Sequence, residues 1–138
     1  NFLLGYALLN TGQKEEAEKY FELAINFYDS LTINQPESRV PNLYYDITDG
    51  YWGFPYFILT CTWSARGEKE KALENMRLLR KNYRAFDIQV VTFLKYFPML
   101  DNIRNEPEFR EYLIEAETHY NAEHKKVEKL LREEGIIR

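Results

Sequence analysis

The chain has 138 residues, of which 45% are hydrophobic and 29% charged, so it can bury a core and is not compositionally disordered. Its 18 Lys and Arg against 22 Asp and Glu give a net charge of -4, which argues against a nucleic-acid surface, because such a surface needs clustered positive charge. No apolar run approaches the roughly 18–20 residues of a membrane span, and no catalytic motif is visible.

The numbers of glycine, proline and cysteine residues narrow the possible classes of fold further. Gly and Pro are scarce, at 6 and 5, which favours helices over a β-sandwich. Cys61 is the single cysteine, so an internal disulfide is ruled out and a reducing, cytoplasmic location is expected. The chain begins with Asn1 instead of Met, and we expect it to be a piece of a longer protein. These features predict one helical domain over 1–138 that is not an enzyme and holds no cofactor or metal.

The expected fold follows from an internal repeat in the sequence, because such repetition is typical of proteins built from stacked repeat units. Gly12 and Gly67 each precede a Lys-Glu pair and then a small residue, Ala17 or Ala72, with the same spacing. Each glycine suits a left-handed exit from a preceding helix. Apolar residues at spacings of three and four around the first glycine predict a hairpin of two helices over 1–33.

The first hairpin resembles the tetratricopeptide (TPR) repeat. The matching residues are Leu4, Gly5, Gly12, Ala17, Phe21 and Ala24, with Leu59, Gly67, Ala72 and Met76 in the second unit. Leu8 stands where the repeat has Tyr, and Thr60 stands where it has Gly. The resemblance implies an all-α fold, a short solenoid of helical hairpins whose first helices line a concave surface.

The spacing of the two units predicts an insertion between them. A TPR repeats every 34 residues, whereas the two glycines lie 55 positions apart (67 minus 12), so we expect an insertion or loop over 34–50. The second hairpin is expected over 51–84. Pro55 fits the first turn of a helix, where its missing N–H costs nothing. One longer helix from about Asn42, kinked at Gly53–Pro55, is the open alternative.

Residues 86–138 are expected to form capping helices. A short apolar helix over Phe86–Phe97 precedes a tight turn, and Asn105 is the expected N-cap of a long final helix that stops at Gly135. This region also resembles the C-terminal ends of bacterial multidomain regulators that join a DNA-binding or signalling module to TPR-type repeats. The resemblance rests on Phe97-Pro98, Leu100 to Arg104, Glu106 to Phe109, Tyr120, Ala122 to His124, Val127 and Gly135. It implies the sensing or docking part of a larger cytoplasmic regulator.

The titratable residues indicate structural roles rather than a catalytic or metal-binding site. His119 and His124 lie about 140° apart around a helix, so they cannot share a metal ion as an i,i+4 pair could. Cys61 is expected to be a buried, inert thiol, because no cluster of positive charge surrounds it in the sequence. The second unit concentrates positive charge with interleaved glutamates, which favours an exposed helix surface over an anion site; the residues are Lys69, Lys71, Arg77, Arg80, Lys81 and Arg84.

Aromatic residues are the most unusual feature, at 16% of the chain. Half of residues 44–57 are aromatic, and they either fill the space that the insertion makes or form a contact surface. By the TPR resemblance, the first helix of each hairpin would face a groove that binds a protein or peptide. The groove residues would be Phe2, Tyr6, Asn10, Phe54, Phe57, Cys61 and Ser64.

The final helix supports an alternative function. A row of apolar residues repeats along it at spacings of three and four, interrupted by Glu123, as in a helix that pairs with another helix. The row consists of Phe109, Leu113, Ala116, Tyr120, Val127 and Leu130. The leading prediction is therefore a non-catalytic protein-binding or peptide-binding module, and the alternative is a self-association element that forms a dimer through this seam.

Overall fold

The computed structural model describes residues 1–33, 54–82 and 88–137, and every regular element in these ranges is helical, which confirms the predicted all-α class. No helix in the described ranges is long and apolar enough to cross a membrane. The helices are α1 (Phe2–Asn10), α2 (Lys14–Ile33), α4 (Phe54–Ala65), α5 (Lys69–Asn82), α6 (Ile88–Tyr96) and α7 (Pro107–Glu133), with a 3₁₀ turn η2 (Pro98–Leu100) before α7.

The predicted turns at the two glycines are confirmed and share one geometry. Gly12 and Gly67 have φ of +80° and +82°, in the left-handed region where a side chain would be strained. Each turn closes with an N–H bond from the residue after the glycine to the carbonyl five positions earlier, 2.9 Å long in both cases (Gln13 to Leu8, Glu68 to Trp63). This bond is accepted by a carbonyl in the last turn of the first helix, where carbonyls lack the regular helical partner.

The two hairpins pack on each other through α2 and α4. The carboxylate of Glu18 in α2 forms an ion pair with Arg66 in the turn after α4. The Arg66 guanidinium and the Lys71 ammonium both lie over the Trp63 ring, at 4.9 and 4.3 Å from its centroid. Pro55 lies in the first turn of α4, as predicted, whereas the expected start of the second hairpin at residue 51 lies outside the described residues.

Several predictions fall on residues outside the described ranges. These are the insertion over 34–50, the alternative helix start near Asn42, and the aromatic residues 44–53. The choice between core and contact surface for that aromatic segment therefore stays a prediction.

A third pair of helices follows the two hairpins, in the region where capping helices were predicted. Arg104 lies in the connection between α6 and α7. Its guanidinium donates hydrogen bonds to the carbonyls of Leu94, Lys95 and Phe97 at the end of α6. The last carbonyls of a helix have no partner within it, and a planar guanidinium with five donors can serve several at once; the Phe97 carbonyl also accepts from the Leu100 N–H at 3.0 Å. Ile103, next to it, is fully buried.

The predicted N-cap of the last helix was wrong by one residue. The N-cap is Glu106, with φ -69° and ψ 136°, and Pro107 is the first helical residue. A proline disfavours helical geometry in the residue before it, and its fixed φ suits the first helical position. The Asn105 side chain instead accepts a hydrogen bond from Arg110 at 3.0 Å. The helix stops as predicted, at Gly135 with φ +69°.

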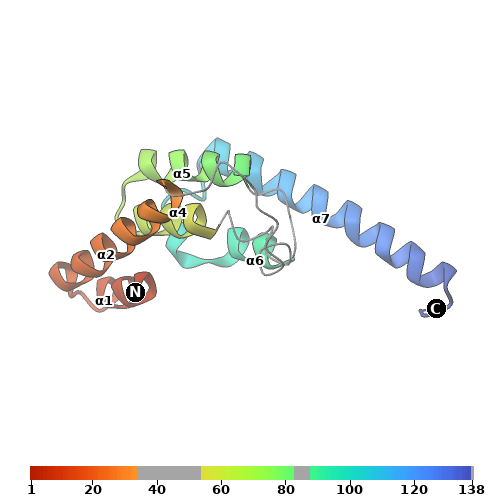
Figure 1. Cartoon of the computed structure of the whole chain (residues 1–138), viewed down its shortest axis with the longest axis horizontal. Helices are drawn as coiled ribbons and strands as arrows, with labels where there is room; N and C mark the ends of the chain where they lie inside the picture. The colour runs from red at the N-terminus through yellow and green to blue at the C-terminus, as the bar shows by residue number, and fades with distance from the viewer. Residues whose placement is uncertain (34–53, 83–87, 138) are drawn as a thin grey trace.

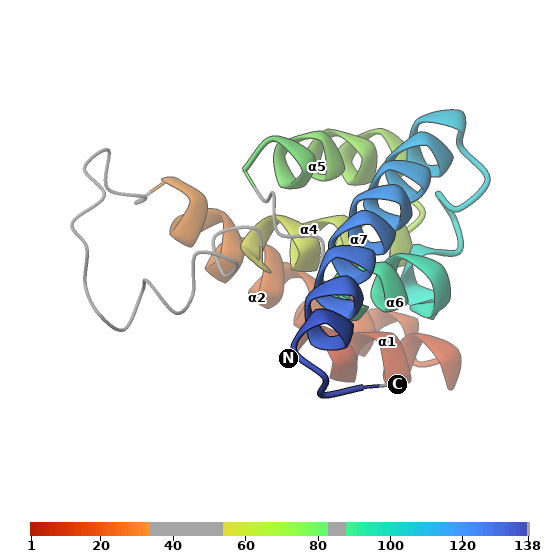
Figure 2. The same ribbon diagram turned by 90° about the vertical axis from the view of Figure 1, so that its right-hand side faces the viewer.

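The molecule has a packed body and a projecting arm. Figure 1 shows α4 at the centre, with α1 and α2 on one side and the start of α7 on the other. Figure 2 shows the first half of α7 crossing close to α5 and α6. Its second half extends away from the body to the C-terminus (Figure 1).

Gly5 provides a test of the first hairpin's packing. A Cβ on Gly5 would lie 2.8 Å from Cδ1 of the buried Phe21 ring and 3.2 Å from the Ala17 carbonyl oxygen. We expect Gly5→Ala to destabilise the protein by about 1–2 kcal/mol, because overpacking costs more than the roughly 1 kcal/mol that alanine contributes to a helix. The measurement is the free energy of unfolding in urea.

Replacing the ring separates these two effects. In a Phe21→Val background the ring atoms Cδ1 and Cε1 are gone and only the contact with the Ala17 carbonyl oxygen remains, so Gly5→Ala should cost clearly less than in the wild type. If Gly5→Ala stabilises both backgrounds equally, the close packing of α1 on α2 is contradicted.

Candidate functional site

The predicted groove residues of α1 lie at or near the surface. Phe2 and Tyr6 are half-buried and pack with one side against the core, while Asn10 is exposed. On α4, Phe57 is half-buried and stacks on Phe93 of α6, with ring centroids 5.5 Å apart. The side chain of Phe54 is not among the described ones. Phe2, Tyr6 and Phe57 thus combine a packed side with an accessible side.

Cys61 and Ser64 were wrong as groove residues. Both are fully buried, because α4 is enclosed by α2, α5 and η2. The Ser64 carbonyl accepts a hydrogen bond from the Asn102 amide at 2.7 Å, which fastens α4 to the turn before α7. Burial raises the pKa of the Cys61 thiol well above its usual value, so the thiol stays protonated, as predicted for an inert cysteine.

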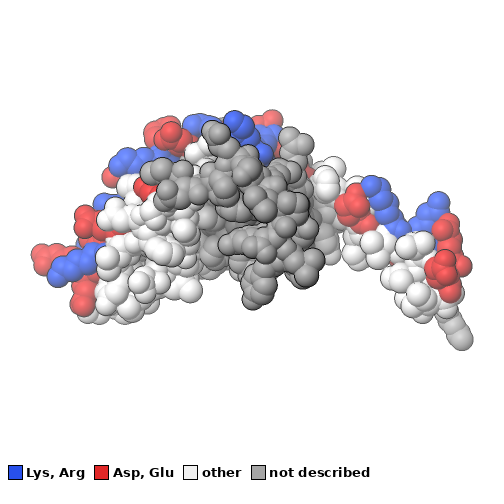
Figure 3. Space-filling model, viewed as in Figure 1, with Lys and Arg blue, Asp and Glu red and all other residues white. Residues whose placement is uncertain are grey.

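The surface of α1 is unusual for a helix at the edge of a protein. Gly5 is its one buried residue, yet the helix carries no charged side chain, and Leu3 and Leu4 are 55% and 46% exposed. Surface helices normally place charged or polar residues on the face that meets water. In Figure 3 charged side chains gather along the edge over α5, whereas the surface over α1 is largely uncharged.

An exposed apolar stripe on α2 was not predicted from the sequence. Leu23, Phe27 and Leu31 follow one another at intervals of four residues, and all three are exposed. The sequence did contain an indication of this stripe, because the second half of α2 has apolar residues on more than one face. The spacing of three and four predicted one apolar face for this helix, and its members are buried or half-buried: Ala17, Tyr20, Phe21, Ala24, Ile25 and Tyr28.

The positive charge of the second hairpin is used within the chain. Arg77 makes a two-pronged hydrogen bond to the Glu108 carboxylate, at 2.6 and 2.8 Å. Arg80 forms ion pairs with Glu111 and Glu115 of α7. Lys69 is 2.7 Å from the Glu106 carboxylate. These partners are the N-cap of α7 and carboxylates in its acidic first half, so the interpretation of a helix surface rather than an anion site is supported for these three cations.

The predicted seam of the last helix divides into two parts. Phe109 and Ala116 are fully buried inside the chain, so they were wrong as contacts for a second chain. Leu113 and Tyr120 are half-buried and pack against the same core. The last two seam residues, Val127 and Leu130, are 54% and 56% exposed.

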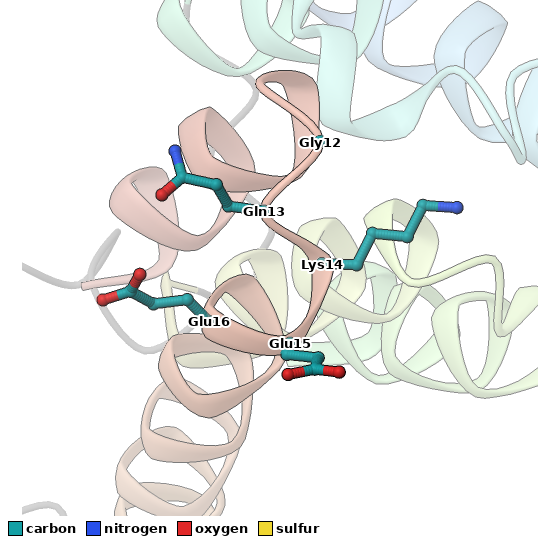
Figure 4. A pocket seen from close by; sticks show the side chains of 5 residues that line it. All are labelled: Gly12, Gln13, Lys14, Glu15 and Glu16. Carbon is teal, nitrogen blue, oxygen red and sulfur yellow. The ribbon is translucent and has the colours of Figure 1, made fainter.

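Other features of the described residues offer no binding site. A shallow hollow lies at the turn between α1 and α2, lined by the run Gly12 to Glu16. In Figure 4 the side chains around it diverge, with Gln13 and Glu16 pointing one way and Lys14 the other. No group of three His, Cys, Asp or Glu residues within the described ranges is placed to hold a metal ion.

Comparison with family models, curated proteins and solved structures finds no match to this chain. The TPR resemblance therefore rests on the residues and the paired turns themselves.

The Arg77–Glu108 pair predicts how stability depends on pH. Its hydrogen bond lowers the pKa of Glu108 below the ordinary 4.5. A carboxylate with a lowered pKa stabilises the fold above its unfolded value, and this contribution is lost as the pH falls through the folded value. We expect Arg77→Gln to destabilise the protein at pH 7 and to differ progressively less from the wild type below pH 4.5.

The measurement is urea unfolding of both proteins across this pH range. The matched control is Lys81→Gln on the exposed face of α5, which removes a charge without disturbing this pair. A difference between Arg77→Gln and the wild type that stays constant down to pH 3, roughly a unit or more below the usual range for glutamate, would contradict the assignment.

Proposed function

We propose that this chain is a non-catalytic module that binds a protein or peptide, and that α1 carries the contact surface. The observation that supports this proposal is the exposure of an uncharged helix. Contiguous apolar surface of this kind commonly marks a site of interaction. The paired turns and the stacking of α2 on α4 agree with a TPR-like solenoid, an architecture that exposes extended binding surfaces.

The chemistry of α1 indicates the kind of partner. Leu3 and Leu4 can contact apolar side chains, while the Tyr6 hydroxyl and the Asn10 amide can exchange hydrogen bonds with a peptide backbone. Tyrosine gives contact area at a small cost in conformational entropy. The proposed partner segment is therefore largely apolar and uncharged.

Aromatic residues extend this surface toward the second and third helix pairs. Phe57, Phe93 and Phe97 form one group of rings, with centroids 5.5 to 5.9 Å apart. Phe57 belongs to the groove predicted from the TPR resemblance. We propose that this group forms the edge of the same contact surface.

The proposed setting is the docking part of a larger cytoplasmic regulator. Its support is the resemblance of residues 97–138 to the ends of such regulators. Within that setting the domain would recognise a partner and leave the effector activity to another module.

A matched pair of substitutions tests the proposal. Asn10 and Asn26 are both exposed, the first on α1 and the second on α2. The probe is a displayed library of random dodecapeptides, selected on the immobilised wild-type chain. We expect enriched peptides to be apolar, and we expect Asn10→Lys to weaken their binding about tenfold, because it places a charge against an apolar partner.

Asn26→Lys serves as the control, since it makes the same change in charge outside the proposed surface. Peptide binding is measured by fluorescence polarisation, with thermal unfolding to check that both variants fold. Equal binding by the two variants, or a selection that enriches no peptide, would overturn the proposal.

A further inference from the structure

The second half of α7 presents a helical surface that the described chain leaves bare. Residues 121–127 are all exposed, and so are Leu130, Ile136 and Ile137 beyond them. The helix spans 27 residues, or about 40 Å at 1.5 Å per residue, and its second half extends past the body (Figure 1).

The bare surface continues an interface that the first half of α7 already forms. Phe109, Leu113, Ala116 and Tyr120 pack on the body at alternating spacings of four and three. The same seven-residue rhythm runs on through Val127 and Leu130. A rhythm of this period keeps one face of a helix against a partner helix. The exposed half therefore has the pattern of a surface built to pack on another helix.

We propose that the partner is a second copy of this chain, with the two α7 helices paired antiparallel across a two-fold axis. Val127 of each copy would then pack on Leu130 of the other copy. The pairing would also bring Tyr120 close to Ile137 of the other copy, so that the apolar residues at both ends of the bare segment become covered. This inference is independent of the proposed function, which concerns α1.

Charge along the edge of the seam favours the antiparallel direction. Lys126 and Glu133 both lie about 100–120° to one side of Val127 around the helix, so they share one edge of the seam. In an antiparallel pair the two copies meet along this same edge, which places Lys126 beside Glu133 of the other copy. Within one chain Lys126 pairs with Glu123 and Glu133 pairs with Lys129, so each would exchange or share its partner on pairing, and the two-fold axis makes the new pair twice. In a parallel pair these two residues would not face each other.

The seam also contains elements that limit its strength. Glu123 and Glu134 occupy the seven-residue rhythm at positions that would otherwise be apolar. Their carboxylates would face each other between the copies, which costs energy at neutral pH. Together with the short length of the bare segment, this places the dimer in the class of small, transient interfaces, with a dissociation constant on the order of 10–100 µM.

Charge reversal tests the geometry of the pair. Association is measured by sedimentation equilibrium of the 138-residue chain from roughly 5 to 500 µM, a range chosen to bracket the expected constant. We expect Lys126→Glu and Glu133→Lys each to weaken association about tenfold, because each places two like charges side by side. The double variant Lys126→Glu/Glu133→Lys should recover wild-type association, since it restores both pairs with reversed sign.

Two control variants separate this seam from general surface effects. Lys125→Glu makes the same change in charge one residue away, on the side of the helix that faces away from Val127, and it should leave association unchanged. Ile114→Asp alters an exposed apolar residue in the first half of α7, on the opposite side from the seam, and it should also have no effect. Circular dichroism checks that each variant retains its helices.

A gain of association provides an independent measurement. Glu123→Leu completes the apolar row and should tighten the dimer about tenfold or more. The proposal is overturned if the wild type and Glu123→Leu are both monomeric up to the highest concentration. It is also overturned if Lys126→Glu associates as well as Lys125→Glu, because the antiparallel pairing requires that difference.

Discussion

The enclosure of α4 is the constraint on which the other packing relationships depend. This helix lies between α2 on one side and α5 and η2 on the other, so a charged side chain on its middle turns would be buried at high cost. Two of its polar residues bond to their own helix. The hydroxyls of Thr60 and Thr62 donate to the carbonyls of Tyr56 and Ile58 at 2.7 and 2.8 Å. Both hairpins and the start of the last helix pair are assembled around this helix.

The charged residues of the chain follow from the same arrangement. With α4 uncharged, charge lies on the outer helices, where α5 offers cations and the first half of α7 offers carboxylates. Ion pairs such as Arg77 with Glu108 then join two surfaces that are already close, and they orient α7 more than they stabilise the fold. Once these pairs form, Lys69, Arg77 and Arg80 are engaged within the chain. The uncovered apolar surfaces that support our two proposals lie on α1 and the second half of α7, toward opposite ends of the molecule (Figure 1).

Local chemistry explains why so much of the helical framework was predictable. Gly12 and Gly67 adopt positive φ because the chain must reverse direction there, and this requirement is met within a few residues. Pro55 and Gly135 mark a helix start and a helix end for equally local reasons. The error at Asn105 has the same origin, because two adjacent residues could each cap α7 and the proline ring decided between them.

Sequence patterns were enough to predict the helices and turns of the described residues, because those choices depend on neighbours in the chain. Tertiary structure alone decided which side of each helix meets water. Cys61 and Ser64 looked suitable for a groove until α2, α5 and η2 were placed around them. Nothing in the row along α7 indicated that the body would cover Phe109 and Ala116 and end before Val127. Exposure is a property of segments distant in sequence that come together in space, and the periodicity of one helix carries no record of where its neighbour stops.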